Sequence, residues 1–122
     1  MAKKIYVVDD NDDIRQIAVD LYSRRNYNAV GFSDADSLLE TIAKGELPDL
    51  ILMDTDMPPG IKGYEACKKL KETNRNVNHI KIIGMSGNDY KDEWTRAGAD
   101  HYFSKPLNLF EVLSKTKELL GE

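Results

Sequence analysis

The stretch from Asp49 to Gly60 most constrains the fold that this chain can adopt. It reads Asp-Leu-Ile-Leu-Met-Asp-Thr-Asp-Met-Pro-Pro-Gly, an apolar run of four residues between two acids, followed by a breaker of prolines and glycine. The run is too short for a helix and predicts a strand that is buried on both faces. Asp54 then lies where a buried strand ends, in a position that is fixed by the strand and open to a ligand in the loop.

Four other short apolar runs predict strands, and each of the five is followed by a stretch with helical periodicity. We expect the strands at residues 5–8, 28–32, 50–53, 80–85 and 101–103. Five strands that alternate with five helices predict an α/β fold, in which helices cover both faces of a parallel sheet.

Capping residues and apolar stripes give the approximate bounds of the helices. Ser33 with Asp36, and Asn108 with Glu111, resemble capping boxes at the starts of the second and fifth helices. The apolar stripe of the first helix includes Ile17 and Ala18, and that of the last includes Phe110 and Leu113. We expect a polar surface connection over residues 73–79.

Length and charge limit the classes of function. The chain has 122 residues, which suits one domain over residues 1–122 without an output module. It shows no signal peptide and no apolar stretch of membrane-spanning length, so we expect a cytoplasmic protein. A net charge of −4 without a basic stripe disfavours membranes and nucleic acid as direct partners. The single Cys67 falls on a helical apolar face and predicts a buried thiol.

Four of the five expected strands end in side chains that can take part in chemistry: acids, a hydroxyl and an ammonium. The first ends at Asp9 and Asp10, the third at Asp54, the fourth at Ser86 and the fifth at Lys105. In a doubly wound parallel sheet, ligands bind beyond the carboxyl ends of the strands. These five side chains are therefore expected to meet at one edge of the sheet.

Three carboxylates at one shielded edge repel one another unless a cation lies between them. Their oxygen ligands, without a histidine or cysteine at any strand end, favour Mg²⁺. The Ser86 hydroxyl and the Lys105 ammonium then remain as donors for an anion. We interpret this set as a site for phosphoryl transfer to Asp54, with the added negative charge neutralised from three directions.

The same motifs, in the same order and spacing, resemble the receiver domain of two-component response regulators. The resemblance covers the chain from about Lys4 to the end and is carried by Val7-Val8-Asp9-Asp10, Leu52-Met53-Asp54, Met57-Pro58, Met85-Ser86-Gly87, Ala97-Gly98-Ala99-Asp100 and Ser104-Lys105-Pro106. It implies a flavodoxin-like fold with five strands in the order 2-1-3-4-5 and five helices. It also implies a signalling protein that is not an enzyme, beyond its own phosphorylation and dephosphorylation.

The resemblance assigns a role to each acid. Asp54 would accept a phosphoryl group from a phosphohistidine of a sensor histidine kinase or a histidine phosphotransfer protein. Asp10 would bind Mg²⁺ directly, Asp9 would act through a bound water, and the backbone carbonyl of Asp56 would complete the metal's ligands.

The resemblance also implies a conformational switch. Ser86 would close on the phosphoryl group, Lys105 would bind it, and Tyr102 would turn inward as Ser86 moves. The Lys105-Pro106 peptide bond is expected to be cis. The face formed by the fourth helix, fifth strand and fifth helix would then bind a downstream target protein, or the phosphoryl group would pass along a relay.

The chain departs from the receiver pattern in the loop after Asp54. This loop looks one residue longer than usual, and Lys62 stands where an acid is common. The side chain of Asp56 would lie near the line along which water attacks the phosphoryl group. We predict that Asp56 and Asn88 set the lifetime of the phosphorylated state, in a direction that Asp56→Asn would decide.

Two alternatives to this function, and two positions for Trp94, stay open at this stage. Asp54-Thr55-Asp56 also resembles the Asp-x-Asp of haloacid-dehalogenase-type phosphatases, although in that family the acid pair comes last rather than first. The chain could also be a receiver-like module that binds partners without phosphorylation. Trp94 either packs between the fourth helix and the sheet or lies on the outer face used for partners. The cognate kinase, target and pathway are not encoded in any recognisable motif.

Overall fold

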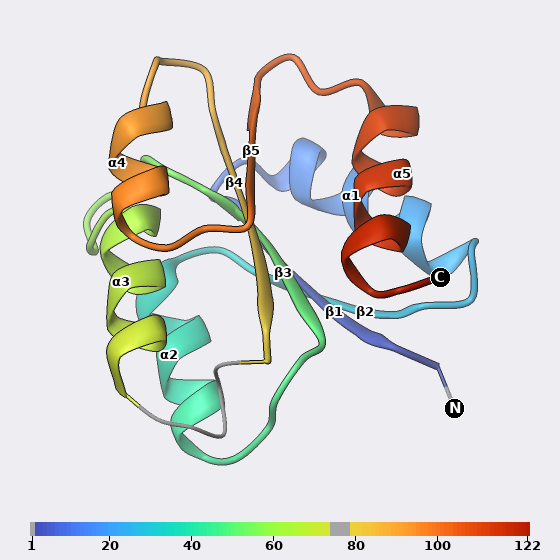
Figure 1. Ribbon diagram of the computed structural model, residues 1–122, viewed down its shortest axis with the longest axis horizontal. Coiled ribbons are helices and arrows are strands. Elements are labelled where there is room, and N and C mark those ends of the chain that lie inside the picture. The colour runs from blue at the N-terminus through green and yellow to red at the C-terminus, as the bar shows by residue number, and fades with distance from the viewer. Residues whose placement is uncertain (1, 74–78) are drawn as a thin grey trace.

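The computed structural model of the chain describes residues 2–73 and 79–122 (Figure 1). Strands and helices alternate strictly in the described residues. The strands are β1 Lys4–Val8, β2 Asn28–Phe32, β3 Leu50–Asp54, β4 Lys81–Ser86 and β5 His101–Ser104. The helices are α1 Asp12–Ser23, α2 Ala35–Ala43, α3 Gly63–Thr73, α4 Lys91–Arg96 and α5 Leu109–Leu119. The expected surface connection after α3 lies largely outside the described residues.

The five strands form one parallel sheet in the order β2-β1-β3-β4-β5, which confirms the predicted fold. Figure 1 shows α1 and α5 on one face of this sheet and α2, α3 and α4 on the other. Alternate residues of each central strand feed two separate cores. In β3, Leu50 and Leu52 pack beneath α1 and α5, whereas Ile51 and Met53 pack beneath the other three helices.

Helix starts follow the predicted capping chemistry, with one correction. Asn108 caps α5 by accepting from the backbone N–H groups of Phe110 and Glu111. For α2 the expected Ser33 cap is wrong, because Asp34 is the N-cap and accepts from the N–H of Ser37. Either residue can cap a helix, and the choice depends on where the chain turns out of β2.

Two residues that the apolar stripes assigned to the core are exposed. Ile17 on α1 keeps 52% of its surface accessible, and Phe110 on α5 keeps 81%. Both lie at the margin of a stripe whose centre is buried at Ala18 and Val112, so the stripe was read one residue too wide.

Two other side chains are buried. Cys67 on α3 is fully buried, and burial raises the pKa of its thiol to about 12. Trp94 on α4 is also fully buried, which confirms the packing interpretation and excludes the outer-face position. Among the described residues, no helix has both the length and the apolar character needed to cross a membrane.

Candidate functional site

Parallel pairing brings the ends of four strands to one edge of the sheet. Val8 of β1 pairs with Met53 of β3, and Asp54 pairs with Met85 of β4. Ser86 at the end of β4 pairs in turn with Ser104 of β5. The side chains predicted at the strand ends therefore follow directly from the register.

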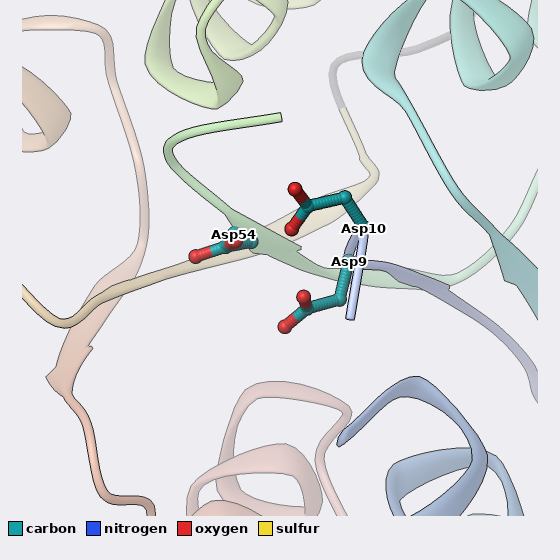
Figure 2. A group of neighbouring side chains, drawn as sticks. All are labelled: Asp9, Asp10 and Asp54. Carbon is teal, nitrogen blue, oxygen red and sulfur yellow. The ribbon is translucent and has the colours of Figure 1, made fainter. Parts of the chain in front are cut away.

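Three carboxylates converge at this edge (Figure 2). Asp9, Asp10 and Asp54 each place a carboxylate oxygen within 4.8 Å of the others. Asp9 is completely buried and Asp54 is only 6% exposed, whereas Asp10 lies in solvent contact. Oxygen-only donors at this spacing, with one open side, match the ligands that Mg²⁺ takes in proteins.

Two neighbours hold Asp9 in place, one through its carboxylate and one through its backbone carbonyl. The backbone N–H of Asn11 donates to Asp9 Oδ1 at 2.9 Å. Arg15 Nη1 donates to the backbone carbonyl of Asp9 at 2.8 Å. The end of β1 is thereby tied to the first turn of α1. Asn11 and Arg15 were not among the predicted site residues, because their contribution depends on the turn between β1 and α1.

Lys105 reaches both buried acids. Its Nζ lies 3.0 Å from Asp9 Oδ2 and 3.2 Å from Asp54 Oδ1. The backbone N–H of Lys105 donates to the carbonyl of Ser86 at 2.8 Å, and the Lys105-Pro106 peptide bond is cis, as expected. The ammonium thus faces Asp54, as the sequence interpretation required.

The environment of Asp54 favours its protonated form. Burial raises the pKa of Asp54 to about 6, with a further upward contribution from the charge of Asp9. Lys105 and the backbone N–H of Thr55 oppose this change by stabilising the carboxylate. A carboxylate with a raised pKa is a stronger nucleophile than an ordinary aspartate and is still mostly ionised at neutral pH.

Ser86 and Tyr102 meet the same loop. Ser86 is almost fully buried, and its Oγ accepts from the N–H of Asn88 at 3.1 Å. Tyr102 is partly exposed, and its hydroxyl donates to the Asn88 carbonyl at 2.8 Å. The same hydroxyl accepts from the N–H of Tyr90 at 3.2 Å. Asn88 therefore connects the serine to the tyrosine through its backbone.

Lys62, in the unusual loop after Asp54, contacts two residues near the site. Its Nζ forms an ion pair with Asp56 and lies 5.7 Å from the centre of the Tyr90 ring. The loop also contains a cis peptide bond between Pro58 and Pro59, which the sequence interpretation did not include. The lysine at a position where an acid is expected thus pairs directly with Asp56, two residues after Asp54.

Comparisons with known proteins identify relatives of this chain. The family of response regulator receiver domains matches residues 5–117. The sporulation initiation phosphotransferase F of Bacillus subtilis strain 168 is 29% identical, over 98% of this chain and 95% of its own length.

Two solved structures are similar in fold. A CheY-like response regulator receiver domain protein from Methanospirillum hungatei JF-1 is 27% identical, with a TM-score of 0.88 over 99% of this chain and 95% of that one. The receiver domain of a sensor histidine kinase from Pseudomonas aeruginosa PAO1 is 22% identical, with a TM-score of 0.87 over the full length of both chains. That structure holds a magnesium ion in its active site cleft.

Proposed function

Because the chain belongs to the family of response regulator receiver domains, a phosphoacceptor signalling module, we propose that Asp54 is its phosphorylation site. The phosphoryl donor would be a phosphohistidine of a histidine kinase or a phosphotransfer protein. The observation that carries the proposal is the position of Lys105 Nζ, 3.2 Å from Asp54 Oδ1 and in contact with Asp9.

In the proposed reaction, an Asp54 carboxylate oxygen forms a bond to phosphorus as the bond from phosphorus to the histidine nitrogen breaks. The electron pair stays on the imidazole, and the product is an acyl phosphate. Lys105 would then donate to a phosphoryl oxygen. The Ser86 hydroxyl, whose oxygen accepts from the N–H of Asn88, would turn and donate its hydrogen to another.

The acids fit a magnesium ion. Asp9, Asp10 and Asp54, with the backbone carbonyl of Asp56, would hold it. Mg²⁺ would supply charge neutralisation between the acids and the incoming phosphoryl group. The chain's own contribution is to fix Asp9 through Asn11 and Arg15 and to leave Asp10 open to solvent.

An apolar groove beside Lys105 supports docking of a protein donor. A groove of about 250 Å³ lies between α1 and the segment that follows β5. It is lined by Ile14, Ile17, Ala18, Lys105, Pro106, Leu107 and Leu109. The exposed Ile17 lines this groove. We propose that an amphipathic helix bearing the phosphohistidine packs here and presents its imidazole to Asp54.

The segment that links Ser86 to Tyr102 would transmit the conformational change from the site to the surface. If Ser86 turns to the phosphoryl group, the segment around Asn88 would move, and the hydrogen bonds that Tyr102 makes to Asn88 and Tyr90 would change. Movement of Tyr102 would change the face formed by α4, β5 and α5, which would bind the downstream protein.

The direct test is incubation with acetyl phosphate and Mg²⁺, followed by intact-protein mass spectrometry. We expect a mass gain of one phosphoryl group in the wild-type protein and none in Asp54→Asn. Asp13→Asn, which changes an exposed acid on α1 outside the cluster, is the matched control and should be phosphorylated normally. Phosphorylation of Asp54→Asn at the wild-type rate would disprove the assignment.

A further inference from the structure

We propose that Thr55 is a positioning residue for phosphoryl transfer, and that Trp94 orients its hydroxyl for this purpose. In this role Thr55 would hold the acceptor Asp54 and the hydroxyl of Ser86 at a fixed separation. The inference rests on the proposed function of Asp54 and assigns a role to two residues that do not contact the phosphoryl group.

A chain of two buried hydrogen bonds connects three elements. Trp94 Nε1 on α4 donates to Thr55 Oγ1 at 2.7 Å. Thr55 Oγ1 donates to the backbone carbonyl of Met85 on β4 at 2.9 Å. Thr55, Met85 and Trp94 all have an accessible surface of 0%. No solvent competes with these bonds, so their loss would leave a buried polar group without a partner.

The direction of each bond follows from the chemistry of the groups. The indole N–H can only donate, and a carbonyl oxygen can only accept. The Thr55 oxygen must therefore accept from Trp94, which leaves its own hydrogen for Met85. Trp94 thus prevents rotation of the hydroxyl and keeps it on β4.

Thr55 extends the pairing of β3 and β4 beyond the backbone ladder. The last paired residues are Asp54 and Met85. Thr55 comes directly after the acceptor, and Met85 comes directly before Ser86. The backbone of Thr55 is also held, because Gly63 N–H donates to its carbonyl at 2.9 Å. The hydroxyl of Thr55 therefore fixes the relative position of the two strand ends that carry Asp54 and Ser86.

Two glycines make room for the indole of Trp94, which donates the first of these two hydrogen bonds. A methyl group at Gly84 would collide with the six-membered ring of Trp94. One at Gly63 would collide with the Asp54 carbonyl and would come within 2.9 Å of the Trp94 ring. A tryptophan at this place on α4 thus depends on glycine in β4 and at the start of α3.

The test measures phosphorylation from acetyl phosphate with saturating Mg²⁺. In this reaction an Asp54 oxygen bonds to phosphorus while the phosphorus–oxygen bond to acetate breaks, and acetate leaves with the electron pair. We expect Thr55→Val to lower the first-order rate by about tenfold, because small misplacements of reacting groups can cost up to ~10²-fold. Thr55→Ser, which keeps the hydroxyl, should restore most of the rate.

A second background separates positioning from a general loss of packing. If Thr55 acts by placing Ser86, Thr55→Val should lower the rate by less than about twofold in a Ser86→Ala protein, since the two changes then remove one shared contribution. Equal fractional losses in both backgrounds, or a wild-type rate in Thr55→Val alone, would overturn the proposal.

The chain offers a matched control for the loss of a buried hydroxyl. Thr116 on α5 is also fully buried, with its Oγ1 2.8 Å from the Tyr22 hydroxyl and 2.9 Å from the Val112 carbonyl. Thr116→Val should reduce stability as Thr55→Val does and leave the phosphorylation rate unchanged. A similar loss of rate in Thr116→Val would show that the effect is one of stability.

Two further outcomes are distinguishable. If Thr55→Val does not fold, Trp94→Phe removes the orienting N–H and should also show a loss of rate that depends on Ser86; a loss that ignores Ser86 would overturn the proposal. If the wild-type protein itself gains no phosphoryl group, the proposed function of Asp54 fails and the positioning role fails with it.

Discussion

At the scale of single residues, the proposed role of Asp54 conflicts with its buried environment. As the proposed phosphoryl acceptor it must be ionised, yet its burial beside Asp9 raises its pKa to about 6. The ammonium of Lys105 opposes this effect but must serve both acids. The ionised carboxylates of Asp9 and Asp54 therefore repel each other in the folded protein. A metal ion or a neutral side chain at residue 54 would reduce this repulsion.

This conflict predicts that Asp54→Asn stabilises the metal-free protein in a pH-dependent way. Because the pKa of Asp54 is raised in the folded state, the contribution of Asp54 to wild-type stability falls as the pH rises from about 4 through about 6, by at most about 3 kcal/mol. The variant lacks this loss. We expect equal stabilities near pH 4 and an advantage for Asp54→Asn of about 1 to 3 kcal/mol at pH 7.5.

Urea denaturation in EDTA across this pH range would measure the difference. Asp13→Asn is the control and should stay within about 0.5 kcal/mol of the wild type at each pH. A lower stability of Asp54→Asn at pH 7.5 would show that the Lys105 contact outweighs the charge repulsion.

The pair of Asp56 and Lys62 gives a second prediction, for the lifetime of the phosphorylated protein. While Lys62 binds Asp56, that carboxylate cannot accept a proton from an attacking water. We expect Lys62→Met to speed dephosphorylation several-fold, well below the ~10²-fold of a fully positioned base, because Asp56 remains partly exposed. Decay of the mass shift after removal of acetyl phosphate measures the rate.

The control for this prediction is the same change in a different background. In Asp56→Asn the carboxylate is absent, so Lys62→Met should have little further effect on the decay. An equal acceleration in both backgrounds would mean that Lys62 acts on the phosphoryl group directly. Slower decay in Lys62→Met would mean that a free Asp56 repels the attacking species.

At the scale of elements, the sequence predicts strands better than it predicts neighbours. Short apolar runs place all five strands, and the receiver motifs place Asp54 and Lys105 on one edge. The cap at Asp34 was missed because it depends on where the chain turns out of β2, and the exposure of Phe110 because the apolar stripe of α5 is narrower than the sequence suggests. The contact of Thr55 with Trp94 was missed for a similar reason, since it spans 39 residues.

The packing of α4 on β4 predicts that alanine lowers the stability of the protein at one glycine and leaves it almost unchanged at another. Gly84→Ala would force a methyl group into the Trp94 ring and should cost about 1 to 3 kcal/mol of unfolding free energy, as overpacking usually does. Gly87→Ala adds a methyl group that meets no described atom within 4 Å and should change stability by less than about 0.5 kcal/mol. Thermal and urea unfolding of both variants would test the pair, and equal losses would contradict it.

At the scale of the whole molecule, the sheet separates two cores and keeps the functional edge at its end. Ile5, Leu52 and Ile83 belong to the core beneath α1 and α5, and Tyr6, Ile51 and Ile82 belong to the core beneath α2, α3 and α4. Both cores rest on the same strands, so the acids at the strand ends are held from both faces. Binding of an ion at this edge should therefore raise the free energy of unfolding of the entire fold.

This coupling predicts that Mg²⁺ stabilises the protein through Asp10. At a concentration one hundred times its dissociation constant, the ion should add about 2.7 kcal/mol to the free energy of unfolding. Asp10→Asn should lose most of this gain, while Asp13→Asn should keep it. Melting temperatures measured with Mg²⁺ and with EDTA give the comparison, and an undiminished gain in Asp10→Asn would remove this residue from the ion's ligands.

The buried thiol of Cys67 has a practical consequence for labelling the protein. With a pKa near 12 and no accessible surface, it forms almost no thiolate at neutral pH and should ignore maleimides and other alkylating reagents. A cysteine introduced at Phe110, which is 81% exposed, would then be the preferred attachment point for a dye or spin label. The native chain thus permits site-specific labelling of the α5 surface without first deleting its own sulfhydryl.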